Sequence, residues 1–155
     1  MIQIDIDQQQ LKWISLTAVK QYIISSSIKG RGQLKNSEQT PTGHHIIRAK
    51  IGAGLAKNAV FVGRRFTGEI YQPALAQQYP QRDWILTRIL WLSGCEVGHN
   101  RLGDCDTMQR YIYIHGTPDS EPMGIPASHG CIRMRNCDVL ELFDQVTIGC
   151  DVFID

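Results

Sequence analysis

The chain has 155 residues, of which 43% are hydrophobic and 20% charged, as in soluble globular proteins. Its net charge of +1 gives no reason to expect a polyanionic partner such as nucleic acid. No run of about 18 apolar residues is present, so we expect no transmembrane helix and no membrane contact. The length can bury a core without disulfide bonds, and we expect a single domain over residues 1–155.

Short strands separated by turns dominate the predicted elements. Ile2, Ile4 and Ile6 alternate with polar residues, which is the period of a half-buried strand. Residues 30–43 are rich in glycine and polar side chains, so they predict an exposed loop that ends in a simple turn. The other segments with β-type composition are 11–16, 21–29, 44–51, 59–62, 87–92 and 111–115. In the last of these, alternation places His115 on the face opposite the isoleucines, where a cleft could lie.

One clear helix is predicted near residues 137–147. Asn136 is a candidate N-cap, and Asp138 suits the positive end of the helix dipole. An apolar stripe follows, made of Val139, Leu140, Phe143 and Val146. A second, shorter helix is possible around residues 73–78. Many strands with one clear helix predict a mainly-β fold.

The segment from His115 to Arg133 gathers a thiol and two imidazoles. Thiol acyl transfer requires at least a cysteine and a nearby base such as histidine, because the base takes the proton and the thiolate attacks a carbonyl. Gly130 has no side chain to block a carbonyl that approaches the backbone N–H groups around Cys131. Zinc is not expected, because the paired ligand spacings of structural zinc sites do not occur.

Four motifs carry a resemblance to a known family: TPTG at 40–43, GEIY at 68–71, YIYIHGT at 111–117 and SHGCIR at 128–133. The chain resembles the L,D-transpeptidase catalytic-domain (YkuD) family, cysteine enzymes that act on peptidoglycan stem peptides. The resemblance covers roughly residues 1–155. It implies a compact β-sandwich or barrel-like core.

The resemblance implies a role for each motif residue. Cys131 is the expected nucleophile, and a neighbour must lower its pKa from the usual value of about 8.5. His115 is the expected base, with the Gly116 carbonyl accepting a hydrogen bond from its other ring nitrogen. His129 is the rival, because i and i+2 share a face in extended backbone. Arg133 could hold a substrate carboxylate or be a surface residue. The remaining candidates for substrate contact are Ser128, Thr117, Tyr113 and Arg110.

The implied reaction cleaves the bond between meso-diaminopimelate and D-alanine in a tetrapeptide stem, through a Cys131 thioester and without a cofactor. The chain shows no signal-peptide pattern, and its five cysteines form no CxxC pair. We therefore expect a cytoplasmic L,D-carboxypeptidase of murein recycling that acts on muropeptides. One alternative is a periplasmic L,D-transpeptidase whose signal peptide is missing from the sequence. Another is a wall-peptide binding module without catalytic activity.

Overall fold

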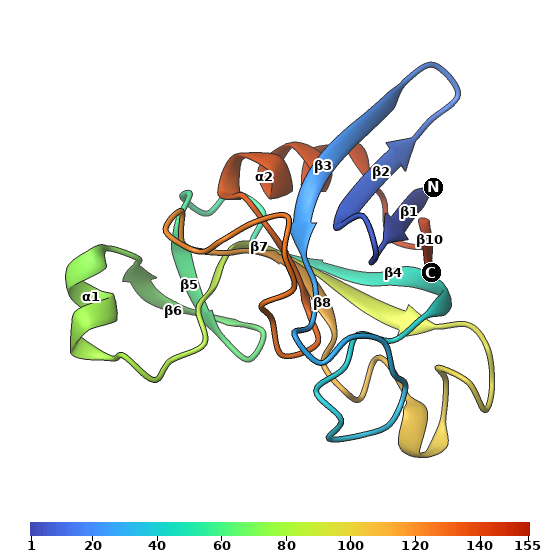
Figure 1. Cartoon of the computed structure of the whole chain (residues 1–155). Coiled ribbons are helices and arrows are strands. Elements are labelled where there is room, and N and C mark those ends of the chain that lie inside the picture. The colour runs from blue at the N-terminus through green and yellow to red at the C-terminus, as the bar shows by residue number, and fades with distance from the viewer.

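The fold is a mixed β-barrel with two helices on its outside (Figure 1). The computed structural model describes all 155 residues. Its strands are β1 (Ile2–Asp5), β2 (Gln10–Ile14), β3 (Val19–Ser25), β4 (Gly43–Ile51), β5 (Ala59–Val62), β6 (Arg65–Ile70), β7 (Ile85–Gly94), β8 (Tyr113–Gly116), β9 (Ile132–Met134) and β10 (Asp151–Ile154). Its helices are α1 (Pro73–Gln78) and α2 (Asn136–Gln145), with a 3-10 turn at Gly103–Cys105. No helix has the length and apolar composition needed to cross a lipid bilayer.

Strand β4 closes the barrel. The sheet runs in the order β4-β10-β1-β2-β3-β9-β8-β7-β5-β6, and β4 also pairs with β7. Eight strands therefore form the closed barrel, while β5 and β6 extend from β7. Most pairings are antiparallel, but β1 with β10 and β8 with β9 are parallel. The parallel pairing of β8 with β9 matters most, because these strands carry the motif residues.

The barrel interior is filled by a main apolar cluster of 19 buried residues. Ile112 and Ile114 belong to this cluster. Helix α2 packs over β7 and β8 and contributes Val139 and Phe143 to the same cluster. Because side chains alternate along a strand, His115 lies on the other face of β8, as the sequence predicted.

The structure corrects the predicted start of the long helix. The helix begins at Asn136, with Arg135 at the N-cap position and no side-chain cap. The Asn136 side chain is fully buried instead and donates hydrogen bonds to Thr117 O at 2.9 Å and Asn58 Oδ1 at 3.0 Å. It therefore ties α2 to the end of β8 rather than capping its own helix. The predicted short helix at residues 73–78 is confirmed.

The buried His45 makes stability depend on pH. Its Nδ1 donates to Gly43 O at 3.0 Å and its Nε2 accepts from the Thr107 hydroxyl at 3.0 Å. Burial lowers the pKa of His45 from 6.5 to about 4. Between these values the unfolded chain binds the proton and the folded chain does not, so acidification favours unfolding. We expect His45 alone to remove roughly 3 kcal/mol of stability between pH 6.5 and pH 4.

Urea denaturation at several pH values checks this expectation. The control is His45→Gln, which cannot titrate, and its free energy of unfolding should depend less on pH over this range. Parallel pH profiles for both proteins would contradict the assignment.

Candidate active site

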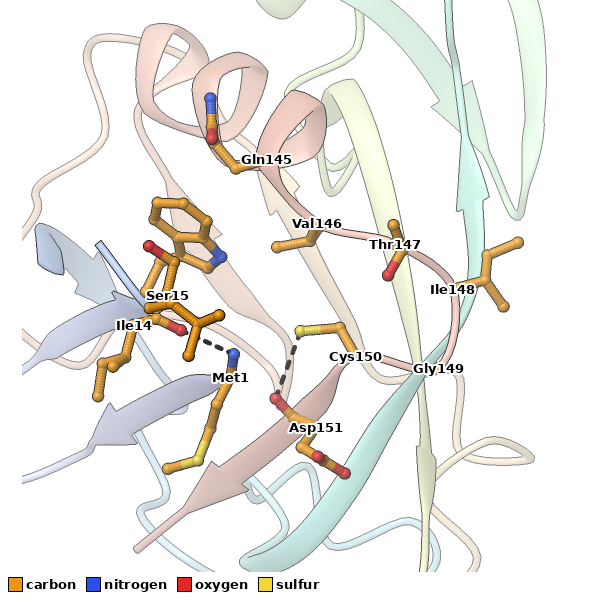
Figure 2. Close-up of a pocket in the computed structure, with 12 residues that line it drawn as sticks. Met1, Ile14, Ser15, Gln145, Val146, Thr147, Ile148, Gly149, Cys150 and Asp151 are labelled. Atoms are coloured by element: carbon orange, nitrogen blue, oxygen red, sulfur yellow. Dashed lines mark hydrogen bonds between the residues drawn. The ribbon is translucent and has the colours of Figure 1, made fainter. Parts of the chain in front are cut away.

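One large cavity has none of the motif residues in its lining. Figure 2 shows the residues that line it. It has a volume of about 670 Å³ and lies between the end of β2 and the segment that follows α2. Its lining contains no histidine, and its one thiol, Cys150, donates to Asp151 O at 3.6 Å. This cavity therefore lacks a base for thiol chemistry.

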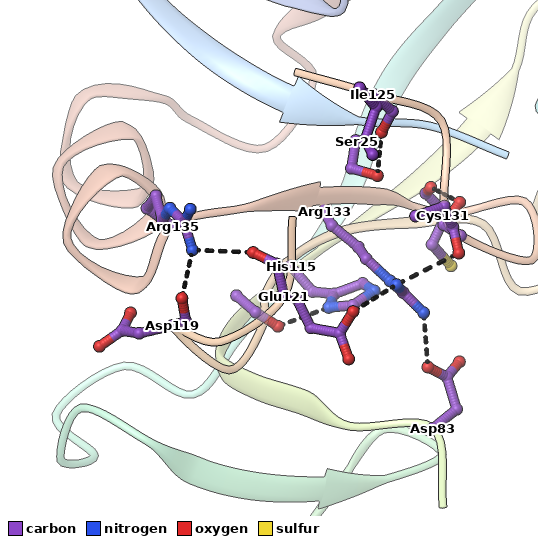
Figure 3. Close-up of polar contacts among 12 residues, drawn as sticks. Ser25, Asp83, His115, Asp119, Glu121, Ile125, Cys131, Arg133 and Arg135 are labelled. Carbon is purple, nitrogen blue, oxygen red and sulfur yellow. Dashed lines mark hydrogen bonds and ion pairs between the residues drawn. The ribbon is translucent and has the colours of Figure 1, made fainter. Parts of the chain in front are cut away.

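The motif residues meet where β8 and β9 run side by side (Figure 3). In the parallel register, Ile114 pairs with Ile132 and His115 pairs with Arg133. Extending this register by one residue places Cys131 beside Tyr113. Cys131 and His115 therefore lie on the same face of neighbouring strands, one diagonal step apart.

Cys131 is partly exposed as a residue, and backbone groups hold its thiol. Its sulfur accepts from Tyr113 N–H at 3.3 Å and donates to Tyr111 O at 3.4 Å. Burial raises the pKa of Cys131 to about 12, although the Tyr113 N–H and two nearby guanidinium groups oppose this shift. The expectation of a lowered thiol pKa is therefore wrong, because loss of solvation outweighs the favourable neighbours.

His115 is buried and carries one strong hydrogen bond. Its Nδ1 donates to Gly116 O at 2.6 Å, which is the contact that the sequence analysis predicted. Burial lowers the pKa of His115, so the ring is neutral at neutral pH. Because a carbonyl oxygen can only accept, the ring proton is on Nδ1 and the Nε2 lone pair is free to take a proton. A protonated thiol and a neutral imidazole thus lie on the same face of the β8–β9 strand pair.

The loop at residues 128–131 presents Cys131, the expected nucleophile. Ser128 Oγ donates to Cys131 O at 2.6 Å and accepts from Gly130 N–H at 3.2 Å. The backbone N–H groups of His129 and Cys131 donate to no acceptor in the protein. Two free N–H groups beside a nucleophile can stabilise a developing oxyanion.

The structure explains the glycine at position 130 by backbone conformation and packing, whereas the sequence suggested that it leaves room for a substrate carbonyl. Its φ of +129° lies in a region that favours glycine. A Cβ atom there would lie 3.2 Å from Ile112 Cδ1 and 3.3 Å from Gln39 O, so it would meet the protein itself. The same φ interrupts the extended backbone, so the argument that His129 and Cys131 share a face does not hold.

Two cavities meet at the exposed ring of His129. The first, of about 340 Å³, is also lined by Thr117, Asp83 and Arg133. The second, of about 240 Å³, is also lined by Arg110 and Tyr111. His129 therefore faces both spaces, whereas His115 is buried in the strand pair. No group of three or more His, Cys, Asp or Glu side chains is arranged to hold a metal ion.

The Arg133 side chain is buried, and its guanidinium is already paired within the protein. It is 7% exposed and donates to Asp83 Oδ1 at 3.1 Å and to Ala127 O at 3.3 Å. Glu121 Oε2 lies 3.6 Å from the same guanidinium (Figure 3). A substrate carboxylate would have to compete with two protein carboxylates for this side chain.

Three other expected substrate contacts are engaged within the protein. Ser128 is 1% exposed and uses its hydroxyl inside the loop. Tyr113 is buried, and its hydroxyl accepts from Arg64 Nη1 at 3.2 Å. Arg110 donates to Gly32 O, Ser37 Oγ and Gln39 O, which ties the 30–42 loop to the site. These side chains support the site rather than offer free groups to a ligand.

Asp83 and Thr40 were not predicted as site residues. Asp83 lies far from the motifs in the chain, so no local pattern could identify it. Thr40 belongs to the TPTG motif, which was interpreted only as a turn. In the structure its buried hydroxyl donates to Gly130 O at 3.0 Å.

Gly116→Ala is expected to destabilise the protein. The added Cβ atom would lie 2.4 Å from Asn136 Oδ1 and 2.7 Å from Leu86 O, and both acceptors are held in place by the fold. Relief of this overlap requires a backbone shift, so we expect a loss of about 2–3 kcal/mol in the free energy of unfolding. Chemical denaturation measures it, and an unchanged midpoint would contradict the packing described here.

Comparisons with known proteins agree with this geometry. The family model for YkuD, described as the L,D-transpeptidase catalytic domain, matches residues 1–154. The probable L,D-transpeptidase YbiS of Escherichia coli is 47% identical over 47 residues, which cover 30% of this chain and 15% of that protein. The L,D-transpeptidase structure from Xylanimonas cellulosilytica has a TM-score of 0.55 at 20% identity, over 99% of this chain and 59% of the solved one. A cysteine-to-serine mutant of the Enterococcus faecium L,D-transpeptidase has a TM-score of 0.58 at 18% identity, over 99% and 48%. The chain thus spans well under two thirds of these relatives, and it belongs to the YkuD family of L,D-transpeptidase catalytic domains.

Proposed function

We propose that this protein cleaves the meso-diaminopimelate–D-alanine bond of peptidoglycan tetrapeptides through a thioester on Cys131, and that water completes the reaction. The protein would then be an L,D-carboxypeptidase of murein recycling in the cytoplasm. The observation that carries the proposal is the pairing of β8 with β9, which places a protonated thiol and a neutral imidazole with a free nitrogen on the same face of neighbouring strands.

The first half of the reaction forms the thioester. Rotation about the Cβ–Sγ bond turns the Cys131 proton from Tyr111 O toward His115 Nε2. The sulfur attacks the carbonyl carbon of the L-centre of diaminopimelate while the imidazole takes the proton. The carbonyl oxygen becomes an oxyanion and accepts from the N–H groups of His129 and Cys131. Collapse breaks the C–N bond, and His115 returns the proton to the amine of departing D-alanine.

The second half regenerates the enzyme. Water attacks the thioester carbonyl, and His115 takes one of its protons. The C–S bond then breaks, the tripeptide leaves with a free carboxyl group, and the proton passes to the Cys131 sulfur. Both halves use the same base and the same oxyanion donors.

Two observations favour hydrolysis in a reducing compartment. All five cysteines are free thiols, which is typical of cytosolic proteins. Only 12 residues connect His115 to Ser128, and Cys131 is partly exposed as a residue, so water can reach an acyl group on it.

One observation favours L,D-transpeptidation as a second candidate. Because the two cavities meet at His129, one could hold the acyl donor while the amine of a second stem enters through the other. Attack by that amine would give a crosslink instead of a tripeptide, as expected of a periplasmic enzyme.

Incubation with disaccharide tetrapeptide, followed by mass spectrometry, distinguishes these reactions. Tripeptide with free D-alanine supports hydrolysis, whereas crosslinked dimers support transpeptidation. Binding of the tetrapeptide without any product would support the third alternative, a wall-peptide binding module without catalytic activity. Release of the untagged protein with the periplasmic contents after osmotic shock would contradict the cytoplasmic assignment.

Carbapenems should acylate Cys131. L,D-transpeptidases are known in complex with imipenem and with a faropenem-derived adduct, at 15–17% identity to this chain. The thiol attacks a β-lactam carbonyl in the same way as it attacks the peptide carbonyl, with transfer of its proton to the base. We expect the intact protein to gain the mass of one imipenem, and Cys131→Ala to gain none. An unmodified wild-type protein would count against the thioester chemistry.

A further inference from the structure

The Thr40 side chain is fully buried behind the loop that carries the nucleophile. Its hydroxyl donates to Gly130 O at 3.0 Å and accepts from Ser27 N–H at 3.0 Å. A hydroxyl has one proton, and here the backbone N–H of Ser27 directs that proton toward Gly130. Thr40 thus makes a directed contact 90 residues along the chain, one residue before Cys131.

Gly130 O and Cys131 N–H belong to the same peptide group. A trans peptide group is planar, and its C=O and N–H point in opposite directions. When Thr40 holds the oxygen on the buried side, the N–H of Cys131 must point away from that side. This N–H donates to no acceptor in the protein, so it is free to donate to a ligand.

We propose that Thr40 is a positioning residue, whose hydroxyl aims the Cys131 N–H at the oxyanion that forms during acylation. The inference rests on the proposed acyl-transfer function and adds a residue to it. The hydrogen bond to Gly130 O also polarises the peptide group, which makes its N–H a stronger donor. Thr40 touches neither the substrate nor the reacting atoms.

The segment around Thr40 is itself held firmly. Thr40 N–H donates to Gly30 O at 2.9 Å, and Gly32 N–H donates to Thr40 O at 2.9 Å. Arg110 Nη2 donates to Gln39 O at 2.6 Å. A group that positions another must have its own conformation fixed, and these contacts fix Thr40.

Two reactions of the same thiol test the inference. Imipenem acylates the sulfur through an oxyanion, whereas iodoacetamide alkylates it by displacement and forms none. We expect Thr40→Val to slow acylation about 10–100-fold, because it misaligns one oxyanion donor. Alkylation should change by less than about twofold, since it does not use that donor. Thr40→Ser keeps the hydroxyl and should restore acylation.

Thr42→Val is the matched control, because Thr42 belongs to the same turn but its hydroxyl accepts from Gln33 Nε2 instead. Intact-protein mass spectrometry gives the acylation rate. Peptide mapping gives the alkylation rate of Cys131 itself, because the four other free thiols also react with iodoacetamide. Thermal melting confirms that the variants are folded. If the valine variant does not fold, Thr40→Ala carries the same comparison.

Equal losses in acylation and alkylation would show a structural role and overturn the inference. Unchanged acylation in the valine variant would also overturn it. A wild-type protein that is alkylated but never acylated would overturn the proposed function, and this inference with it.

Discussion

Cys131→Ala is expected to lose essentially all turnover of tetrapeptide, by more than about 10⁴-fold in kcat. In the proposed reaction the sulfur forms the covalent bond to the acyl group, and no other cysteine belongs to β8, β9 or the 128–131 loop. The fold should survive, because the sulfur makes only two weak backbone contacts, at 3.3 and 3.4 Å. The measurement is release of D-alanine, with unfolding temperature recorded beside it.

Cys137→Ala is the matched control for this prediction. Cys137 is an exposed thiol on α2 and donates only to the neighbouring Asp138 at 3.6 Å. Its removal should leave kcat unchanged. Activity retained in Cys131→Ala, or lost in Cys137→Ala, would mean that the nucleophile has been misidentified.

His115→Gln is expected to lower kcat by about 10²–10⁴-fold, the usual contribution of a general base. Glutamine can still donate to Gly116 O, but it offers no basic nitrogen to the thiol. His129→Gln separates the two candidate bases, and we expect it to cost less than about tenfold in kcat. The opposite ranking of these variants would assign the base to His129.

The pH profile of the wild-type enzyme gives a second measure of His115. Its folded pKa lies below 6.5, because burial disfavours the charged ring. The ring therefore stays unprotonated and active at pH 6.5, and kcat/KM should fall only at more acidic pH. A loss of activity centred above pH 6.5 would contradict the buried, neutral imidazole.

Some strands could be predicted from the sequence because a local alternation of apolar and polar residues specifies them. The alternation of Ile2, Ile4 and Ile6 encodes a strand with one buried face, and the structure has that strand. Strand β9 was not predicted, because it has three residues and exists only through its pairing with β8 and β3. Strand β6 was missed because most of it is exposed and shows no apolar alternation.

In the site, too, local sequence pattern indicated some features, and tertiary contacts determined the others. Cys131 and His115 stand in recognisable motifs, so their residue types and the family resemblance were enough to propose them as site residues. The direction of the thiol pKa could not be predicted, because it depends on how much solvent the folded chain removes from the sulfur. The partners of Arg133 come from two other parts of the chain, so only the folded structure shows that its guanidinium is already occupied.

The raised pKa of Cys131 should slow oxidation of its sulfur under oxidative stress. Peroxide attacks thiolates far faster than thiols, so a sulfur that holds its proton is shielded from conversion to sulfenic acid. The nucleophile becomes reactive only when a substrate carbonyl arrives and the proton can move to His115. Oxidative damage should therefore reach the exposed Cys137 before it reaches the Cys131 sulfur.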